Sequence, residues 1–203
     1  KSMDYYHNLV TEKSWKELQN LRRRVDVVLI GGWAAYLYTK TLKSKDIDVI
    51  VDYDALPVLA KLYDVRKNNR LKKYEATREE VQIDIYLPHY SQIGIPAEEL
   101  LKHTITLEGF RVVEVNYLIA LKLFTFGRRG GSTKGRKDFI DIVSLLSTPS
   151  VDYGQIKHIA RNYNLEDALG NFIRVLGSTF EMVELRLNKH AFSKLKKNIV
   201  LHL

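Results

Sequence analysis

The chain has 203 residues, enough for one large domain or two small ones. Its balance of 45% hydrophobic and 28% charged residues is that of a globular protein, and no apolar run is long enough to predict a membrane-spanning helix. Cysteine is absent, which excludes disulfides and thiolate chemistry and fits a cytoplasmic protein. The net charge of +8 suggests an anionic partner, either RNA or an acidic protein.

The first half of the chain alternates apolar strands with short helices. Strands are predicted over Val25–Ile30, Ile47–Val51, Val81–Leu87 and Arg111–Val115. Helices are predicted over Ser14–Arg24 with Ser14 as N-cap, over Trp33–Tyr38, from Ala55 to about Arg66, and from Pro96.

From Asn116 onward, the sequence pattern predicts helices only. They are predicted over residues 117–126, 137–146, 153–163, 166–189 and 191–203, and a break of the fourth helix near Gly177 is the alternative to one continuous helix. We therefore expect an α+β fold, with an α/β domain holding a mixed sheet in residues 1–115 and a helical bundle in residues 116–203. A catalytic cleft is expected between the two, because ligand sites favour domain interfaces.

Two aspartates, Asp46 and Asp48, stand at the start of the Ile47–Val51 strand. Because strand side chains alternate, both point to the same face, where their charges repel unless a cation neutralises them. Mg²⁺ suits this pair, since it takes one or two carboxylates together with waters and substrate phosphates. The alternative is a solvated pair at a strand edge.

A glycine pair and a third aspartate complete the pattern. Gly31 and Gly32 directly follow the first apolar strand, and Asp84 lies in the third. If that strand lies beside the Asp46 and Asp48 strand, three carboxylates can hold two cations that clamp an in-line phosphoryl displacement. Taken singly, the glycine pair is only a turn signal, and Asp84 is equally compatible with the polar face of a strand.

This order of motifs resembles the nucleotidyltransferase superfamily related to DNA polymerase β. The resemblance implies that Gly31 and Gly32 lie against the triphosphate of a nucleotide. It also implies that Asp46, Asp48 and Asp84 are catalytic and bind Mg²⁺, with Asp84 activating the acceptor hydroxyl. Many members carry serine where this chain has Gly32, and this departure bears on the subfamily more than on the activity.

The second half adds a further resemblance, to the AbiEii-like and MenT-type toxin nucleotidyltransferases. It rests on Lys122 within an apolar helix, the basic segment Arg128–Lys137, and Asp138 and Asp141 after it. The resemblance implies that Lys122 contacts phosphate and that Lys137 and Asp138 border the nucleotide site, and Asp141 also matches. The alternatives are a lysine that extends to water and a basic loop that is merely solvated.

The activity implied is transfer of a nucleoside monophosphate from an NTP to an acceptor hydroxyl, with two Mg²⁺ ions and release of pyrophosphate. The expected partners are an NTP, an RNA acceptor such as a tRNA 3′ end, and an antitoxin protein if the chain is a toxin; no membrane is expected. One alternative is a small-molecule enzyme of the aminoglycoside type, although a polycationic substrate fits a basic chain poorly. Another is a non-catalytic binding or antitoxin module on the same fold.

Overall fold

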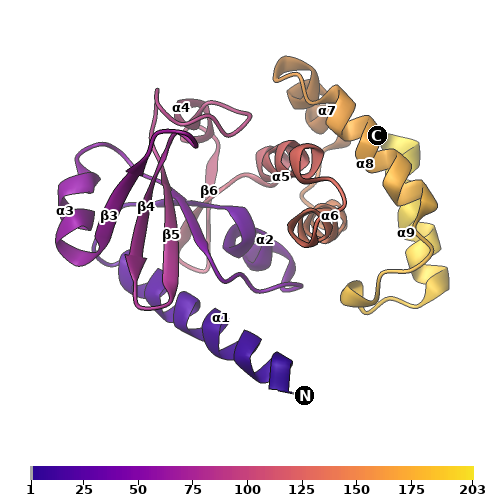
Figure 1. Ribbon diagram of the computed structural model, residues 1–203. Coiled ribbons are helices and arrows are strands. Elements are labelled where there is room, and N and C mark those ends of the chain that lie inside the picture. The colour runs from indigo at the N-terminus through magenta and orange to yellow at the C-terminus, as the bar shows by residue number, and fades with distance from the viewer. Residues whose placement is uncertain (1) are drawn as a thin grey trace. The chain divides into compact units, whose positions relative to one another are not determined.

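The computed structural model describes residues 2–203, with side chains described from Leu9 onward. The chain forms two compact units: one holds the residues up to Leu37 together with Lys43–Val113, and the other holds Tyr38–Leu42 with Glu114–Leu203. The first unit contains a mixed β-sheet with helices, and the second is helical (Figure 1). The predicted α+β fold class is confirmed. The domain boundary after residue 115 stays a prediction.

A seven-stranded sheet organises the first unit, with the strand order β3-β4-β5-β2-β1-β7-β6. The pairs β1–β7 and β2–β5 are parallel, and the other pairs are antiparallel. The strands are β1 (Val28–Ile30), β2 (Ile47–Ile50), β3 (Asp64–Asn68), β4 (Lys73–Arg78), β5 (Val81–Tyr86), β6 (Thr104–Leu107) and β7 (Phe110–Val113). In β5 the side chains alternate, so that Ile83 and Ile85 are buried while Asp84 between them is partly exposed.

The sequence pattern predicts β1, β2, β5 and β7 but does not predict β3, β4 or β6. The helix predicted to reach Arg66 is wrong at its end, because α3 (Ala55–Leu62) stops earlier and β3 begins at Asp64. Both β3 and β6 are edge strands with mostly exposed side chains. In β3 charged residues replace the apolar alternation that identifies a strand, and in β6 the alternation of Thr with Ile and Leu extends over only four residues.

Three further helices belong to this part of the chain: α1 (Ser2–Leu21), α2 (Gly31–Thr39) and α4 (Ala97–Leu100). Ser14 is not the N-cap that the sequence predicts, because it is buried inside α1. Its hydroxyl accepts a 2.8 Å hydrogen bond from the indole nitrogen of Trp33 on α2. The ring of Trp15 lies 5.0 Å from that of Trp33 and 5.4 Å from that of Phe110. These contacts hold α2 against α1 and the sheet.

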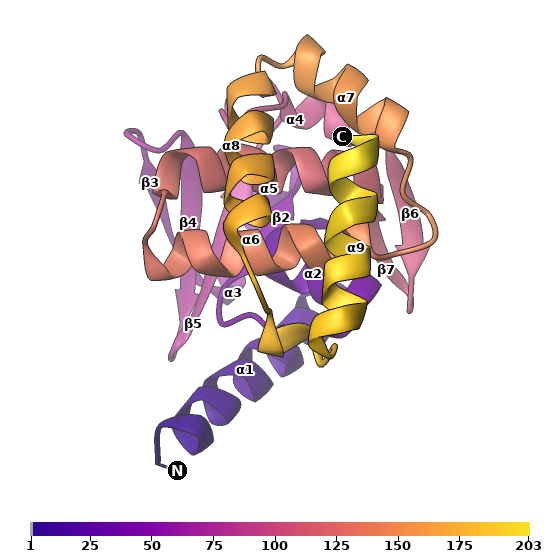
Figure 2. The ribbon, with the colours of Figure 1, turned by 90° about the vertical axis from the view of Figure 1, so that its right-hand side faces the viewer.

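The second unit is built from helices whose apolar faces meet. They are α5 (Val115–Arg129), α6 (Thr133–Leu146), α7 (Tyr153–Asn162), α8 (Glu166–Ser178), the 3₁₀ turn η1 (Val183–Leu185) and α9 (Lys189–His202). Figure 2 shows α5 and α6 side by side, with α8 crossing them. The rings of Phe126, Phe139 and Phe172 pack together, with centroids 5.5–6.3 Å apart. None of the helices in the described residues has the length and apolar character that crossing a bilayer requires.

The basic segment Arg128–Lys137 is mostly helical and not the loop that the sequence suggests. The helix α5 continues to Arg129, and α6 begins at Thr133, which leaves a three-residue connection. Ser132 caps α6 by accepting a 3.1 Å hydrogen bond from the amide of Gly135. The glycines and polar residues that predict a mobile loop therefore form a tight turn and a helix start.

Candidate active site

The register of the sheet places Asp48 and Asp84 side by side. In the parallel pair of β2 and β5, Asp48 lies opposite Asp84. Asp46 comes two residues before Asp48, directly ahead of β2, so strand alternation directs it to the same face. All three aspartates are partly exposed, whereas the neighbouring Ile47 and Ile83 are buried. The sheet thus brings the three predicted carboxylates to one accessible face.

Gly31 is the residue at which β1 passes into α2. In the antiparallel pair of β1 and β2, Ile30 lies opposite Asp48, and Gly31 follows with φ +70°. A Cβ placed on Gly31 would lie only 2.6 Å from the carboxyl carbon of Asp48. Both the left-handed backbone and this close approach require glycine.

The amino end of α2 therefore lies against Asp48. Gly31 and Gly32 occupy its first turn, where backbone N–H groups have no partner within the helix. Such a helix end binds phosphate through these N–H groups and the helix dipole. Gly31 is the glycine in contact with the aspartate strand, and Gly32 is buried in the first turn.

Asp84 is held by Lys73, a residue that the sequence reasoning missed. The Lys73 ammonium lies 2.6 Å from Asp84 and 3.1 Å from Glu75, and its side chain is 8% exposed. Gln82 donates a 2.9 Å hydrogen bond to the other Asp84 oxygen. Burial alone would lower the pKa of Lys73, but its hydrogen bonds and its attraction to Asp84 and Glu75 outweigh this effect and raise it. The lysine stays charged and orients the aspartate.

No signal in the sequence marks Lys73, because it lies on β4, which the pattern does not predict. Only the pairing of β4 with β5, with Glu75 opposite Asp84, places the lysine within reach of the aspartate.

Asp46 and Asp48 fit a Mg²⁺ ion, since paired carboxylates with space for waters and phosphate oxygens are the ligands that this ion takes. Within the described part of the chain, no three His, Cys, Asp or Glu side chains are grouped closely enough to hold a metal by themselves. Asp84 already has Lys73 and Gln82 as partners. A site for two metal ions with three carboxylate ligands therefore stays a prediction.

The second unit contains a buried ion cluster around Lys122. Its ammonium lies 3.0 Å from Asp138 and 2.7 Å from Asp141, and Arg129 lies 2.8 Å from the second oxygen of Asp138. Burial would lower the pKa of Lys122, but the charges and hydrogen bonds of Asp141 and Asp138 raise it. Lys137, on the same helix as the two aspartates, is only half-buried.

The structure thus brings Lys122, Asp138 and Asp141 together. Their predicted role at the nucleotide site stays a prediction.

The comparisons with known proteins rest on structure alone, since neither protein-family models nor curated sequences give a match. A putative nucleotidyltransferase from H. pylori superimposes with a TM-score of 0.52 and 16% identity, over 96% of this chain and 93% of the other. An antigenic nucleotidyltransferase-like protein from Paracoccidioides brasiliensis gives 0.50 and 16%, over 93% and 92%. ANT(2″)-Ia, in complex with adenylyl-2″-tobramycin, gives 0.51 and 14%, over 70% and 89%. The chain has the nucleotidyltransferase fold, as its motifs predict.

Proposed function

We propose that this chain is a Mg²⁺-dependent nucleotidyltransferase that moves a nucleoside monophosphate from an NTP to an acceptor hydroxyl. The observation that carries the proposal is the pairing of Asp48 with Asp84 on neighbouring strands, with Gly31 and the amino end of α2 against Asp48. This arrangement places carboxylates that can bind a metal ion next to backbone N–H groups that can bind phosphate. The fold of solved nucleotidyltransferases supports the same activity.

Each residue has a distinct role in this proposal. Asp46 and Asp48 would hold Mg²⁺, which when bound supplies charge neutralisation for the phosphates. The amides at Gly31 and Gly32 would bind the triphosphate. Asp84, oriented by Lys73, would accept the proton of the acceptor hydroxyl. The acceptor oxygen bonds to the α-phosphorus, the bond from that phosphorus to the bridging oxygen breaks, and pyrophosphate leaves.

RNA is the acceptor that we propose, with a tRNA 3′ end as the first candidate. The basic charge of the chain supports a polyanionic acceptor, and an RNA-modifying toxin with an antitoxin partner is the biological setting that the motifs suggest. An aminoglycoside is the second candidate, because ANT(2″)-Ia shares the fold and its complex contains adenylyl-2″-tobramycin. A polycationic acceptor, however, would have to approach a chain of net charge +8.

The experiment is incubation of the protein with each labelled NTP, Mg²⁺ and either total RNA or an aminoglycoside. Label that stays on RNA through a denaturing gel supports the proposal, and label on the aminoglycoside alone favours the second candidate. The control is Asp48→Asn, which keeps the shape of the side chain and removes the charge. Transfer at the wild-type rate by Asp48→Asn would contradict the catalytic role, and no transfer to any acceptor would favour a non-catalytic binding module.

A further inference from the structure

The β3–β4 hairpin carries a concentration of positive charge that the proposed chemistry does not use. Residues 65–74 include five cations and no carboxylate. Arg66 forms an ion pair with Asp64 at 2.8 Å, and Lys73 forms one with Asp84 at 2.6 Å. The other three, Lys67, Arg70 and Lys72, are exposed and have no carboxylate partner among the described residues.

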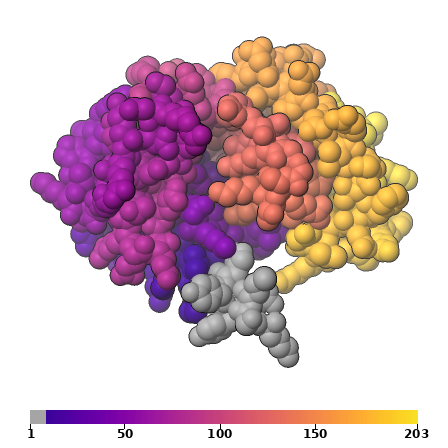
Figure 3. Space-filling view, in the orientation of Figure 1, coloured from indigo at the N-terminus to yellow at the C-terminus, as the bar shows by residue number. Residues whose placement is uncertain are grey.

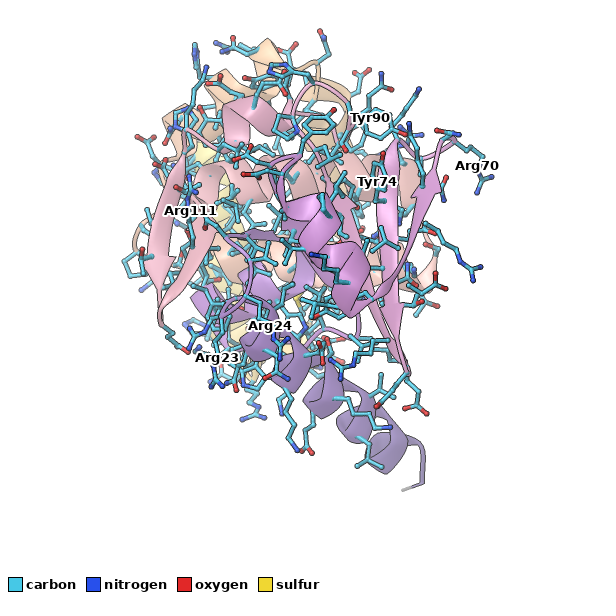
Figure 4. All side chains as sticks on the ribbon, turned by 90° about the vertical axis from the view of Figure 1, so that its left-hand side faces the viewer. Arg23, Arg24, Arg70, Tyr74, Tyr90 and Arg111 are labelled. Atoms are coloured by element: carbon cyan, nitrogen blue, oxygen red, sulfur yellow. The ribbon has the colours of Figure 1, made fainter. Side chains whose placement is uncertain are left out.

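Two tyrosines stand beside these cations. The rings of Tyr74, on β4, and Tyr90, in the turn after β5, are 6.0 Å apart and inclined by 55°. The Lys67 ammonium lies 4.9 Å from the centre of the Tyr90 ring and 5.9 Å from that of Tyr74, and the Lys72 ammonium lies 5.6 Å from the Tyr90 ring. Both tyrosines are partly exposed. Figure 4 shows Tyr74, Tyr90 and Arg70 gathered at one end of the unit, away from Arg23 and Arg24.

We propose that this aromatic-basic surface, made of Lys67, Arg70, Lys72, Tyr74 and Tyr90, binds single-stranded RNA. Cations beside accessible aromatic rings are the combination that single-strand binding uses, since the cations contact phosphates and the rings stack on bases. A lysine over an exposed ring is held weakly and can move to a phosphate, which uncovers the ring for a base. Only an unpaired strand can present its base faces to such rings, so duplex RNA is a poor ligand.

Other basic parts of the chain place a cation beside a single ring: Lys196 lies 5.9 Å from the ring of the exposed Phe180, and Arg128 lies 5.2 Å from that of the partly exposed Phe124. The hairpin instead offers two neighbouring rings with two lysines beside them. Arg22 lies 4.2 Å from the ring of Phe110, but that ring is buried and a base cannot reach it. In the segment Arg128–Lys137, Arg129 is paired with Asp138, and Arg136 lies 3.4 Å from Glu184. The hairpin is therefore the better candidate for nucleic acid than the basic segment that the sequence favours.

The role of this surface as an acceptor-binding site rests on the proposed function. Lys73 contacts Asp84, and Tyr74 follows it on β4 and points to the other face of the sheet. The surface and Asp84 are therefore carried by neighbouring strands but lie on opposite faces of the sheet. In the space-filling view, the hairpin contributes to the exposed surface of the first unit (purple to magenta, Figure 3).

The first test measures binding of labelled oligouridylate by fluorescence anisotropy over a range of salt, without NTP or Mg²⁺. The double variant Lys67→Gln/Lys72→Gln should weaken binding about tenfold and reduce the slope of log Kd against log salt by about 1.4, at about 0.7 for each lost phosphate contact. The matched control Arg23→Gln/Arg24→Gln removes the same charge from exposed positions of the same unit and should leave Kd within about twofold. Equal weakening by both double variants would overturn the proposal.

The second test separates stacking from charge. Tyr90→Ala should weaken oligouridylate binding about tenfold at every salt concentration without changing the slope, and Tyr90→Phe should bind like the wild type because it keeps the ring. Thermal melts show that both variants are folded. Wild-type affinity in Tyr90→Ala, equal affinity for a duplex of the same length, or equally strong competition by polyglutamate would each overturn the proposal.

A further variant separates this surface from the proposed activity. Asp48→Asn should bind oligouridylate like the wild type, so loss of nucleotidyl transfer and loss of RNA binding are observed independently.

Discussion

The two units each bury a lysine between two carboxylates, but the two sites have different surroundings. The side chains of Lys73 and Lys122 are almost equally buried, at 8% and 9% exposed. Asp84, beside Lys73, is 14% exposed, whereas Asp138 and Asp141, beside Lys122, are 3% exposed. The first carboxylate can still reach a substrate, and the other two are closed off from solvent.

The charge balance differs as well. In the second unit, Lys122 and Arg129 match Asp138 and Asp141, so the cluster is complete in itself. In the first unit, one ammonium serves both Asp84 and Glu75, and Asp48 lies next to Asp84 in the sheet. Carboxylates grouped on one accessible face favour a cation, whereas a buried cluster of matched charges is strongly destabilised when one partner is removed. We therefore expect substitutions to affect activity in the first unit and the free energy of unfolding in the second.

The largest expected effect is on stability, in Lys122→Met. Removing the ammonium leaves Asp141 buried without its counter-charge, and the loss of a buried partner costs about 3–5 kcal/mol of unfolding free energy. Because the pKa of Lys122 is raised in the folded state, the ion pair contributes fully below the usual lysine pKa and is lost only as pH rises through the folded value. Urea unfolding should give the same difference between variant and wild type from pH 7 to about pH 10.

The control for this prediction is the double variant Lys122→Met/Asp141→Leu, which leaves no unpaired charge at Asp141 and should recover part of the loss. A loss below about 1 kcal/mol in Lys122→Met, together with a raised KM for the NTP, would instead favour the phosphate contact that the family resemblance implies.

The second effect is on activity, in Asp48→Asn. The charge that would hold Mg²⁺ is removed while the shape of the side chain is kept, so the rate of nucleotidyl transfer should fall at least ~10²–10³-fold. The melting temperature should stay the same or rise, because repulsion from the neighbouring Asp84 is relieved. A rate within tenfold of the wild type, measured at saturating NTP, would contradict the role of the carboxylate pair.

The third effect is on geometry, in Gly31→Ala. Alanine would have to adopt the left-handed backbone of this position, which its Cβ disfavours, and the Cβ would displace the Asp48 carboxylate, so kcat/KM should fall by about 10²-fold. Gly170→Ala is the matched control, because a Cβ at that position in α8 has no atom within 4 Å and should stabilise the helix by about 0.5–1 kcal/mol. Equal activity of the two alanine variants would show that Gly31 does not position Asp48.

The smallest effect is expected for Lys73→Met. Asp84 keeps Gln82 as a partner but loses its orientation, so kcat should fall about tenfold with little change in the KM for the NTP. Stability should change by only about 1 kcal/mol, because Asp84 and Glu75 are partly exposed. Lys73→Arg restores the charge and should recover part of kcat. No such recovery is expected if the lysine has only a structural role.

The comparison of the two units also shows where sequence reasoning succeeds. The carboxylates lie on β2 and β5, which are central strands with buried apolar neighbours, so their alternation is visible in the sequence. Most helices of the second unit were predicted for the same reason, since their apolar faces recur at helical spacing. One continuous helix over residues 166–189 is wrong, because α8 ends at Ser178, next to the alternative break at Gly177. Reasoning fails at β3 and β4, where Lys73, Tyr74 and the basic hairpin lie, because charged and exposed positions interrupt the apolar pattern there. It also fails at the four-residue edge strand β6.

By itself the sequence determined the α+β class, the order of the central strands along the chain, and the aspartates and glycines of the candidate site. These follow from local rules, namely the spacing of apolar residues and the special backbone of glycine. The tertiary structure decided which residues meet. It placed Asp84 opposite Asp48, brought Lys73 to Asp84, and enclosed Lys122 with Asp138 and Asp141. Strand register and helix packing join residues that are far apart in the chain, and their partners are set by burial and charge balance in the folded state.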